Sequence, residues 1–169
     1  MPLALAAGIV VFDRFTKIRI QHSLNSFDFI PVIPDWLRII HTENPGAAFG
    51  VLAEGNPVFR SLILIGVSSL VLMFVAWALW SRNSGFSSAV TRIGLSFILG
   101  GALGNLYDRT VHQTVTDFIE VYHGAWSFPA FNVADSAITV GAVFLLFDLM
   151  RASPKTYGES ARITEQYKS

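Results

Sequence analysis

Asp117 and Asp135 are the residues of this sequence whose types and spacing best suit chemistry. Asp135 lies inside an apolar segment, where an ionisable side chain is costly and usually faces the interior of a helix bundle. Asp117 lies eighteen residues earlier, in the strand-like segment TVTDFIE, and a hairpin between them would bring both carboxylates to one membrane boundary. Two adjacent carboxyl groups cannot both ionise readily, so one keeps a proton while the other stays charged. An aspartyl peptidase requires this division into acid and base.

A polar stripe accompanies Asp135 in the same apolar segment. One helical face would carry the residues spaced i, i+3, i+4 and i+7, which are Asn132, Asp135, Ser136 and Thr139. Such a stripe either holds helices together by hydrogen bonds or forms part of a site. Because polar groups are hard to tolerate against lipid, we favour the site.

The segment GGALGNLYDR brings further polar residues to the end of another apolar run. Gly100 and Gly104 form a small-xxx-small pair, which predicts close packing against a neighbouring helix. Asn105 and Asp108 continue at near-helical spacing, and Arg109 follows Asn105 by four residues, so all three could reach the outer end of the helix. For Asp108 and Arg109, a structural ion pair and a part in the site are both open interpretations.

Other chemistries are disfavoured by what the sequence lacks. Without cysteine there is no disulfide, thiolate nucleophile or Cys-ligated zinc. The four histidines show no H-x-x-x-H spacing and no G-x-S-x-G occurs, which disfavours zinc and serine hydrolases. We therefore expect neither a metal nor a cofactor. Asp13 and Lys17, spaced i, i+4, are expected to form a helical ion pair. Asp148 and Arg151, spaced i, i+3, are expected to form an ion pair at the membrane interface.

The elements that position these residues are those of a membrane protein. Of the 169 residues, 52% are hydrophobic and only 14% are charged, whereas soluble domains have about 25% charged residues. This composition argues against a soluble globular enzyme. The 12 basic and 12 acidic residues balance, which leaves no electrostatic footprint for nucleic acid.

Four apolar segments are interpreted as helices that span a membrane, at about residues 3–21, 58–80, 89–107 and 131–150. Charged residues follow the apolar run of the first segment rather than precede it, which argues against a cleaved signal peptide. We expect one membrane domain over residues 1–151 and a polar cytoplasmic tail over residues 152–169.

Basic residues in the short connections predict the orientation. The connection 81–92 contains Arg82 and Arg92 without an acid and the tail is also basic, so both termini are expected in the cytoplasm. Loops 22–57 and 108–130 then lie outside. In the first of them, FDFIPVIPDWLRIIHT and AAFGVLA predict short strands with turns, in a small sheet on the membrane surface or over the bundle mouth.

Five motifs in order resemble the lipoprotein signal peptidases, or signal peptidase II, which are bacterial intramembrane aspartyl peptidases. The resemblance runs from Val11 to Met150. Its motifs are Asp13 with Lys17, NPGAAFG at Asn44 to Gly50, GGALGNLYDR at Gly100 to Arg109, VTDFI around Asp117, and FNVADS at Phe131 to Ser136.

The resemblance implies that Asp117 and Asp135 are the catalytic pair. It implies substrate-binding or supporting roles for seven other motif residues, namely Asp13, Lys17, Asn44, Gly46, Asn105, Arg109 and Asn132. The implied fold is mostly α-helical, a polytopic membrane protein with four transmembrane helices and a small periplasmic β-sheet.

The implied activity is removal of the signal peptide from diacylglyceryl-modified prolipoproteins, just before the lipidated cysteine. Two carboxylates would activate water without a covalent intermediate. The implied location is the bacterial inner membrane, with the active site near its periplasmic face. The implied partners are the prolipoprotein substrate, membrane lipid and globomycin-type inhibitors.

Two residues depart from the family's usual pattern, since Arg14 stands where Gln is common and Pro45 where Thr is common. Two other functions are consistent with the composition. One is a four-span transporter or channel subunit that uses Asp13, Asp108 and Asp135 for protons or a cation. The other is a structural bundle held together by polar seams. The missing G-x-G-D signature disfavours a presenilin-like or prepilin peptidase.

Overall fold

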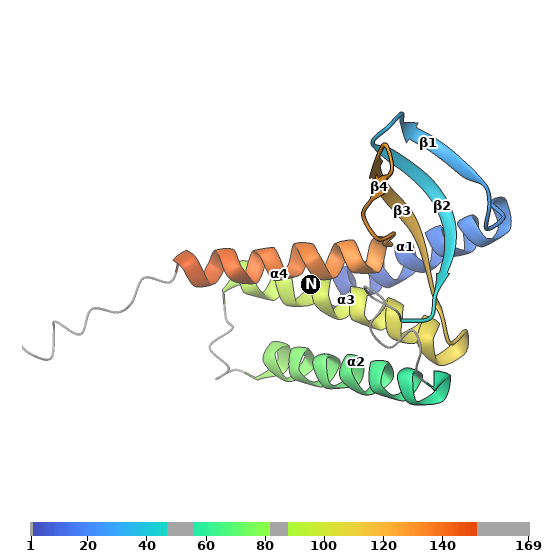
Figure 1. The fold of residues 1–169 in the computed structure, drawn as a ribbon. Coiled ribbons are helices and arrows are strands. Elements are labelled where there is room, and N and C mark those ends of the chain that lie inside the picture. The colour runs from blue at the N-terminus through green and yellow to red at the C-terminus, as the bar shows by residue number, and fades with distance from the viewer. Residues whose placement is uncertain (1, 47–55, 82–87, 152–169) are drawn as a thin grey trace, which may run out of the picture.

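The structure is a computed structural model that describes residues 2–46, 56–81 and 88–151. The described residues form four helices and four strands (Figure 1), in the order α1 (Pro2–Ser23), β1 (Phe29–Ile33), β2 (Leu37–Asn44), α2 (Pro57–Trp80), α3 (Ala89–Val111), β3 (Val115–His123), β4 (Trp126–Ser127) and α4 (Val133–Arg151). The chain is therefore mostly helical with a small antiparallel sheet, as the sequence predicts. Two predicted features, the AAFGVLA strand segment and the tail over residues 152–169, lie outside the described residues.

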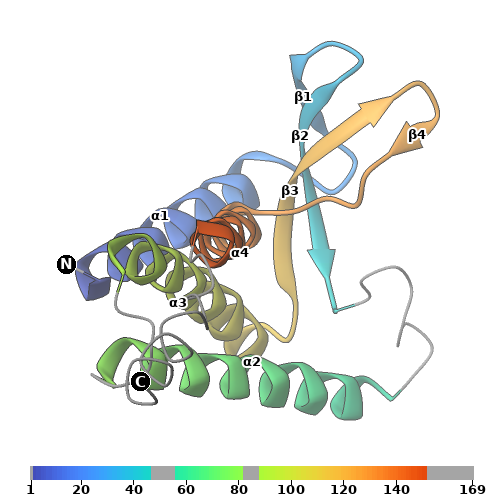
Figure 2. The same ribbon diagram turned by 90° about the vertical axis from the view of Figure 1, so that its left-hand side faces the viewer.

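Helix α3 is the centre of the helical layer. It packs against α1, α2 and α4, and Figure 2 shows it between α2 and the pair formed by α1 and α4. The Ser88 hydroxyl caps its start by accepting the N–H of Thr91. A buried apolar cluster joins α3 to α1 and α2 through Ala6, Val75, Ala78, Leu79, Leu95 and Leu99.

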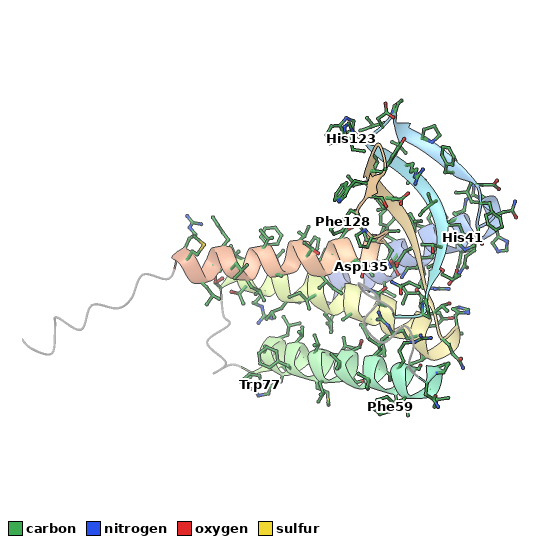
Figure 3. The ribbon with its side chains drawn as sticks, in the orientation of Figure 1. His41, Phe59, Trp77, His123, Phe128 and Asp135 are labelled. Atoms are coloured by element: carbon green, nitrogen blue, oxygen red, sulfur yellow. The ribbon has the colours of Figure 1, made fainter. Side chains whose placement is uncertain are left out.

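Among the described helices, α2, α3 and α4 are long and apolar enough to cross a membrane. Large side chains on α2, including Phe59 and Trp77, point away from the other helices and are more than half exposed (Figure 3). Lipid would cover an apolar surface of this kind, which water-soluble monomers rarely expose. The first predicted segment forms helix α1, but it falls outside this apolar class. Its second half holds four charged residues, Asp13, Arg14, Lys17 and Arg19.

Glycines on α3 allow its neighbours to approach closely. A Cβ atom on Gly101 would lie 2.3 Å from the carbonyl oxygen of Ala134 in α4. A Cβ atom on Gly104 would lie 2.7 Å from Oδ2 of Asp13 in α1. These approaches agree with the close packing predicted for the glycine-rich segment, and they set the helix spacing where the polar residues lie.

Gly101→Ala is expected to lower the free energy of unfolding by about 1–3 kcal/mol, because α3 and α4 must move apart to admit the methyl group. Gly66→Ala on α2 is the matched control, since nothing lies within 4 Å of its added Cβ. That variant is expected to be as stable as the unmodified protein or slightly more so. Unfolding of both purified variants in mild detergent measures the difference, and equal stabilities would argue against the close approach of α3 and α4.

The sheet is antiparallel with strand order β1-β2-β3-β4. The strands predicted in loop 22–57 are β1 and β2, and the strand-like TVTDFIE segment of loop 108–130 lies within β3. The register pairs Thr42 with Asp117 and Asn44 with Val115. Because the first four residues of β3 are buried, Asp117 lies in the interior between the sheet and the helices.

Asp148, near the end of α4, does not form the ion pair with Arg151 that its i+3 spacing predicts. Its Oδ2 accepts hydrogen bonds from the hydroxyls of Ser88 and Thr91, each at 2.6 Å. The Arg151 guanidinium lies over the ring of Phe147 instead. The prediction was wrong because the start of α3 brings two hydroxyl donors to Asp148, which the spacing within α4 cannot indicate.

Candidate active site

The start of α4 holds Asp135 through two reciprocal hydrogen bonds. The N–H of Asp135 donates to Oδ1 of Asn132 at 2.9 Å, and the N–H of Asn132 donates to Oδ2 of Asp135 at 3.2 Å. This capping-box arrangement satisfies N–H groups that a helix start leaves unpaired. Asp135 is therefore fixed in the first turn of α4, where the helix meets the sheet (Figure 3).

Strand β3 joins the start of α4 through the backbone, and this contact brings Asp117 to Asn132. The N–H of Phe131 donates to the carbonyl of Ile119 at 3.0 Å, and the N–H of Ile119 donates back at 2.8 Å. Asp117 lies two residues before Ile119 and so shares its face of the strand. The side-chain amide of Asn132 donates to Oδ1 of Asp117 at 2.7 Å. Asn132 thus contacts both aspartates.

The carboxylate of Asp117 accepts a second amide from the end of β2. Asn44 Nδ2 donates to Oδ2 of Asp117 at 3.0 Å, and Asp117 is only 3% exposed. The Asn44 amide is oriented because its Oδ1 accepts the N–H of Gly46 at 2.8 Å. Gly46 has a φ of 97°, a conformation that favours glycine. Both predicted residues therefore lie on the Asp117 side of the site.

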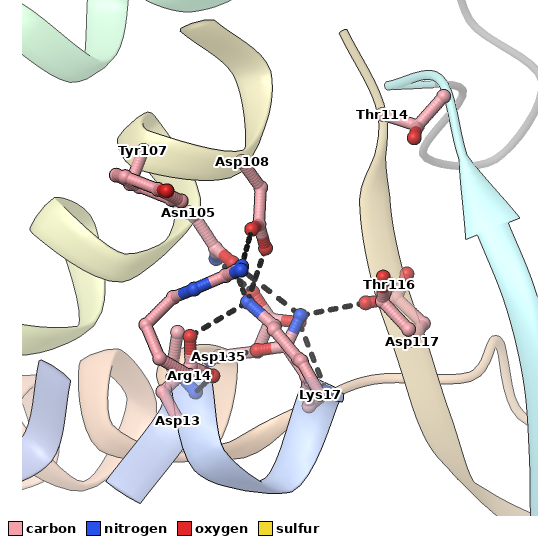
Figure 4. A network of polar contacts seen from close by, with 12 residues as sticks. Asp13, Arg14, Lys17, Asn105, Tyr107, Asp108, Thr114, Thr116, Asp117 and Asp135 are labelled. Atoms are coloured by element: carbon pink, nitrogen blue, oxygen red, sulfur yellow. Dashed lines mark hydrogen bonds and ion pairs between the residues drawn. The ribbon is translucent and has the colours of Figure 1, made fainter. Parts of the chain in front are cut away.

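Asn105 connects Asp135 to a buried ionic network (Figure 4). Its Nδ2 donates to Oδ1 of Asp135 at 2.7 Å, and its Oδ1 accepts from Nζ of Lys17 at 3.1 Å. The Lys17 ammonium also contacts Oδ2 of Asp13 at 2.8 Å and Oδ2 of Asp108 at 2.7 Å. The predicted Asp13–Lys17 ion pair is present, and it extends to a second acid on α3.

Asp13 and Lys17 are fully buried, and their partners fix three helices relative to one another. Oδ1 of Asp13 accepts the N–H of Ala134 at 2.9 Å, so that α1 caps the start of α4. A buried charge is costly unless it is paired, and Lys17 has three oxygen partners for its three protons. The network therefore holds α1, α3 and α4 together next to Asp135.

Arg109 lies in the last turn of α3, and its positive charge interacts with Asp135, Asp117 and Asp108. Its buried Nε makes no hydrogen bond within the part of the chain that the structure describes. Asp108 pairs with Arg14 across the helices rather than with its neighbour Arg109. A local Asp108–Arg109 ion pair was one of the two open interpretations, and the described residues do not form it.

Burial raises the pKa of Asp117 to about 6, opposed by the amide of Asn44 and reinforced by the charge of Asp135. In an unfolded chain, Asp117 loses its proton near pH 3.8, whereas the folded protein holds this proton up to about pH 6. The contribution of this group to the free energy of unfolding is therefore complete below pH 3.8 and is lost as the pH rises through about 6.

Asp117→Asn is expected to remove this dependence on pH. The free energy of unfolding of the unmodified protein, relative to Asp117→Asn, should fall by about 2–2.5 kcal/mol between pH 4 and pH 7. Chemical unfolding at a series of pH values measures it. Asp28→Asn is the control, because Asp28 is exposed. If the stability difference between unmodified protein and Asp117→Asn is constant with pH, the raised pKa is wrong.

A cavity of about 270 Å³ opens beside Asp117 on the side of the sheet. It is lined by Thr42, Glu43, Asn44, Pro45, Asp117, Pro129 and Ala130. Asp117 therefore borders a space between β2 and the segment that precedes α4. No group of three His, Cys, Asp or Glu residues that could hold a metal ion occurs in the described residues.

A polar cluster around Glu43 lies next to the site and was not predicted from the sequence. Burial alone would raise the pKa of Glu43, but hydrogen bonds from Thr114, His41 and Thr116 outweigh it and hold this pKa below its usual range. Thr116 also accepts from Gln21 of α1 at 2.7 Å. The alternation of Thr114 and Thr116 is visible in the sequence, but only the register of β2 with β3 places them beside Glu43.

The chain matches known proteins over most of its length. The pattern of the family described as signal peptidase (SPase) II matches residues 5–151. Similar proteins named lipoprotein signal peptidase include one from Solibacter usitatus, 42% identical over 147 residues (87% of this chain, 88% of that protein). Another, from Pseudomonas fluorescens, is 41% identical over 162 residues (94% of this chain, 91% of that protein).

A solved structure described as a bacterial membrane enzyme, determined by the in meso method, has the same fold. It matches with a TM-score of 0.79 and 28% sequence identity, over 94% of this chain and 93% of that chain. Fold, sequence pattern and relatives agree over the same residues. The chain belongs to the signal peptidase II family.

Proposed function

We propose that this protein is a lipoprotein signal peptidase, a protease that removes the signal peptide from prolipoproteins. Family membership supports the substrate class. The observation that carries the chemistry is that one buried asparagine, Asn132, contacts both carboxylates: its side-chain amide donates to Asp117 and its backbone N–H donates to Asp135. Uncharged donors between two acids are suited to an aspartyl mechanism.

In this mechanism one carboxylate takes a proton from water while the protonated partner donates a hydrogen bond to the scissile carbonyl. The water oxygen bonds to the carbonyl carbon and gives a tetrahedral diol. Collapse of the diol breaks the C–N bond as a proton passes from a carboxyl group to the leaving nitrogen. No covalent bond to the enzyme forms. Either carboxylate can take either role, so we assign neither as the base.

The surroundings of the pair favour retention of a single shared proton. Asn44, Asn105 and Asn132 donate hydrogen bonds to the carboxylates without adding positive charge. A cation in direct contact would instead favour two ionised carboxylates. Within the described residues, the Lys17 ammonium contacts Asn105 rather than either aspartate of the pair, and the Arg109 guanidinium acts on them without forming an ion pair.

The proposed substrate carries diacylglycerol on a cysteine, and the bond cut lies just before that residue. We place the protein in the bacterial inner membrane as a single domain over residues 1–151. Helix α1 serves as a fourth membrane helix, because its buried Asp13 and Lys17 face the bundle rather than lipid. Both termini lie in the cytoplasm, and the site lies near the periplasmic face.

Analysis of the cleavage products tests this proposal. Purified protein in detergent, mixed with diacylglyceryl-modified prolipoprotein, is expected to release a signal peptide and a chain that begins with the lipidated cysteine. Globomycin-type inhibitors are expected to block the release. Added hydroxylamine should leave the signal peptide with a free carboxyl end, because no acyl-enzyme is available to intercept. A hydroxamate product, seen by mass spectrometry, would contradict direct attack by water.

A further inference from the structure

Arg14 places a cation at the edge of the buried ionic network (Figure 4). It follows Asp13 on α1, and its guanidinium pairs with Oδ1 of Asp108 on α3. The same guanidinium lies 4.5 Å from the ring centroid of Tyr107. The Arg14 side chain is 19% exposed, whereas that of Asp108 is 1% exposed. Arg14 therefore supplies charge to a buried acid from a position near the surface.

The charged groups around Asp117 and Asp135 come from several elements. Glu43 of β2 has His41 and two threonines as its own partners. The helices supply the remaining groups, which are Asp13, Arg14, Lys17, Asp108 and Arg109.

Together with the pair, these helix groups comprise four carboxylates and three cations. With every group ionised the cluster has one net negative charge, and a single proton on the pair makes it neutral. Net charge is costly in a buried, weakly polar environment, so the neutral state is favoured. The number of cations around the pair therefore affects how firmly it holds its proton.

Asp108 is the residue through which Arg14 reaches the pair. Its Oδ1 contacts Arg14 and its Oδ2 contacts Lys17. Without Arg14, Lys17 alone would have to neutralise both Asp13 and Asp108. Lys17 hydrogen bonds to Asn105, and its positive charge lowers the pKa of Asp117. The loss of Arg14 would therefore leave the pair in a more negative environment and make its proton harder to remove.

We propose that Arg14 is a positioning residue for the Asp117–Asp135 pair, which acts through Asp108 to set the pH range in which the pair holds one proton. The inference rests on the proposed aspartyl mechanism. It predicts a change in the pH dependence of cleavage rather than a uniform loss of rate. Arg14 thus extends the functional network to the outer surface of α1.

The pH profile of kcat tests this inference. Arg14→Gln is expected to move the alkaline limb of the profile upward by about 0.5–1 pH unit, through the loss of one positive charge. Arg14→Lys keeps the charge and should leave the limb in place. Asp108→Asn removes a negative charge and should move it downward. The double variant Arg14→Gln with Asp108→Asn should return the limb close to that of the unmodified protein.

A purely structural role for Arg14 would give a different result. Rates that fall equally at all pH values in Arg14→Gln, or a double variant whose limb does not return, would overturn the inference. If Arg14→Gln does not fold, Asp108→Asn decides the question, since an unmoved limb contradicts the proposal and a downward shift supports it.

Titration of ¹³C-labelled aspartate carboxyl groups by NMR separates this inference from the proposed function. Asp117→Asn identifies the signal of Asp117. If the unmodified protein cleaves nothing, the peptidase proposal fails, whereas the Asp117 signal still reports the effect of Arg14. A raised pKa of Asp117 in Arg14→Gln supports the charge coupling, and an unchanged pKa overturns it.

Discussion

Asparagine in place of Asp117 or Asp135 is expected to lower the rate of prolipoprotein cleavage by about 10²–10⁴-fold, because the mechanism needs one carboxylate and one carboxylic acid. An amide can neither take a proton from water nor donate one to the leaving nitrogen. The loss should appear in kcat rather than only in KM, since the groups act on the reacting atoms. Initial rates with purified protein and lipidated precursor measure it.

Both variants are expected to insert and fold. In Asp117→Asn the new side chain keeps one oxygen for Asn44 or Asn132, so about one hydrogen bond is lost, at a cost of about 1–3 kcal/mol. Relief from burying a charged carboxylate offsets part of this cost. Asp148→Asn is the matched control, because it makes the same change at the opposite end of the helix that carries Asp135. Substantial cleavage by either of these two variants would exclude Asp117 and Asp135 as the catalytic pair.

Lys17→Met is expected to reduce the free energy of unfolding by about 3–5 kcal/mol, the second large effect. The variant removes the ammonium that contacts Asp13, Asp108 and Asn105, and it leaves Asp13 as a fully buried carboxylate without its cation. The start of α4 should also become less ordered, since Asp13 accepts the N–H of Ala134. Denaturant or SDS titration in mixed micelles measures this loss.

Arg19→Met is the matched control for Lys17→Met. It removes the same charge from the same helix, two residues further on, at an exposed position. A change of less than about 0.5 kcal/mol is expected there. If the two variants were equally stable, the buried network would not hold the helices together, and the inferred connection from α1 to Asp135 through this network would be wrong.

Local patterns in the sequence predicted the parts of the site that lie within one element. The i, i+3 spacing of Asn132 and Asp135 corresponds to the capping box at the start of α4. The i, i+4 spacing of Asp13 and Lys17 corresponds to a buried ion pair. The strand-like character of the segment around Asp117 corresponds to β3. In each case the contact is set by helix or strand geometry over a few residues.

Contacts between distant elements could not be predicted in this way. The amide of Asn44 reaches Asp117 because β2 pairs with β3, and this register depends on both loop 22–57 and loop 108–130. Asp13 caps Ala134 across 121 residues of sequence. The prediction of an ion pair between Asp148 and Arg151 was wrong for a related reason. Asp148 instead accepts hydrogen bonds from two hydroxyl groups at the start of α3. Such partners follow from helix packing rather than from spacing.

In the proposed mechanism, Asp117 and Asp135 together hydrolyse a lipidated precursor. The most direct measurement is cleavage of diacylglyceryl-modified prolipoprotein by detergent-purified protein, beside the unlipidated precursor and the Asp135→Asn variant. We expect cleavage of the lipidated precursor alone, and loss of this cleavage in the variant. If well-folded protein cleaves neither precursor, the peptidase proposal is wrong, and a transporter whose buried acids carry protons or a cation is favoured.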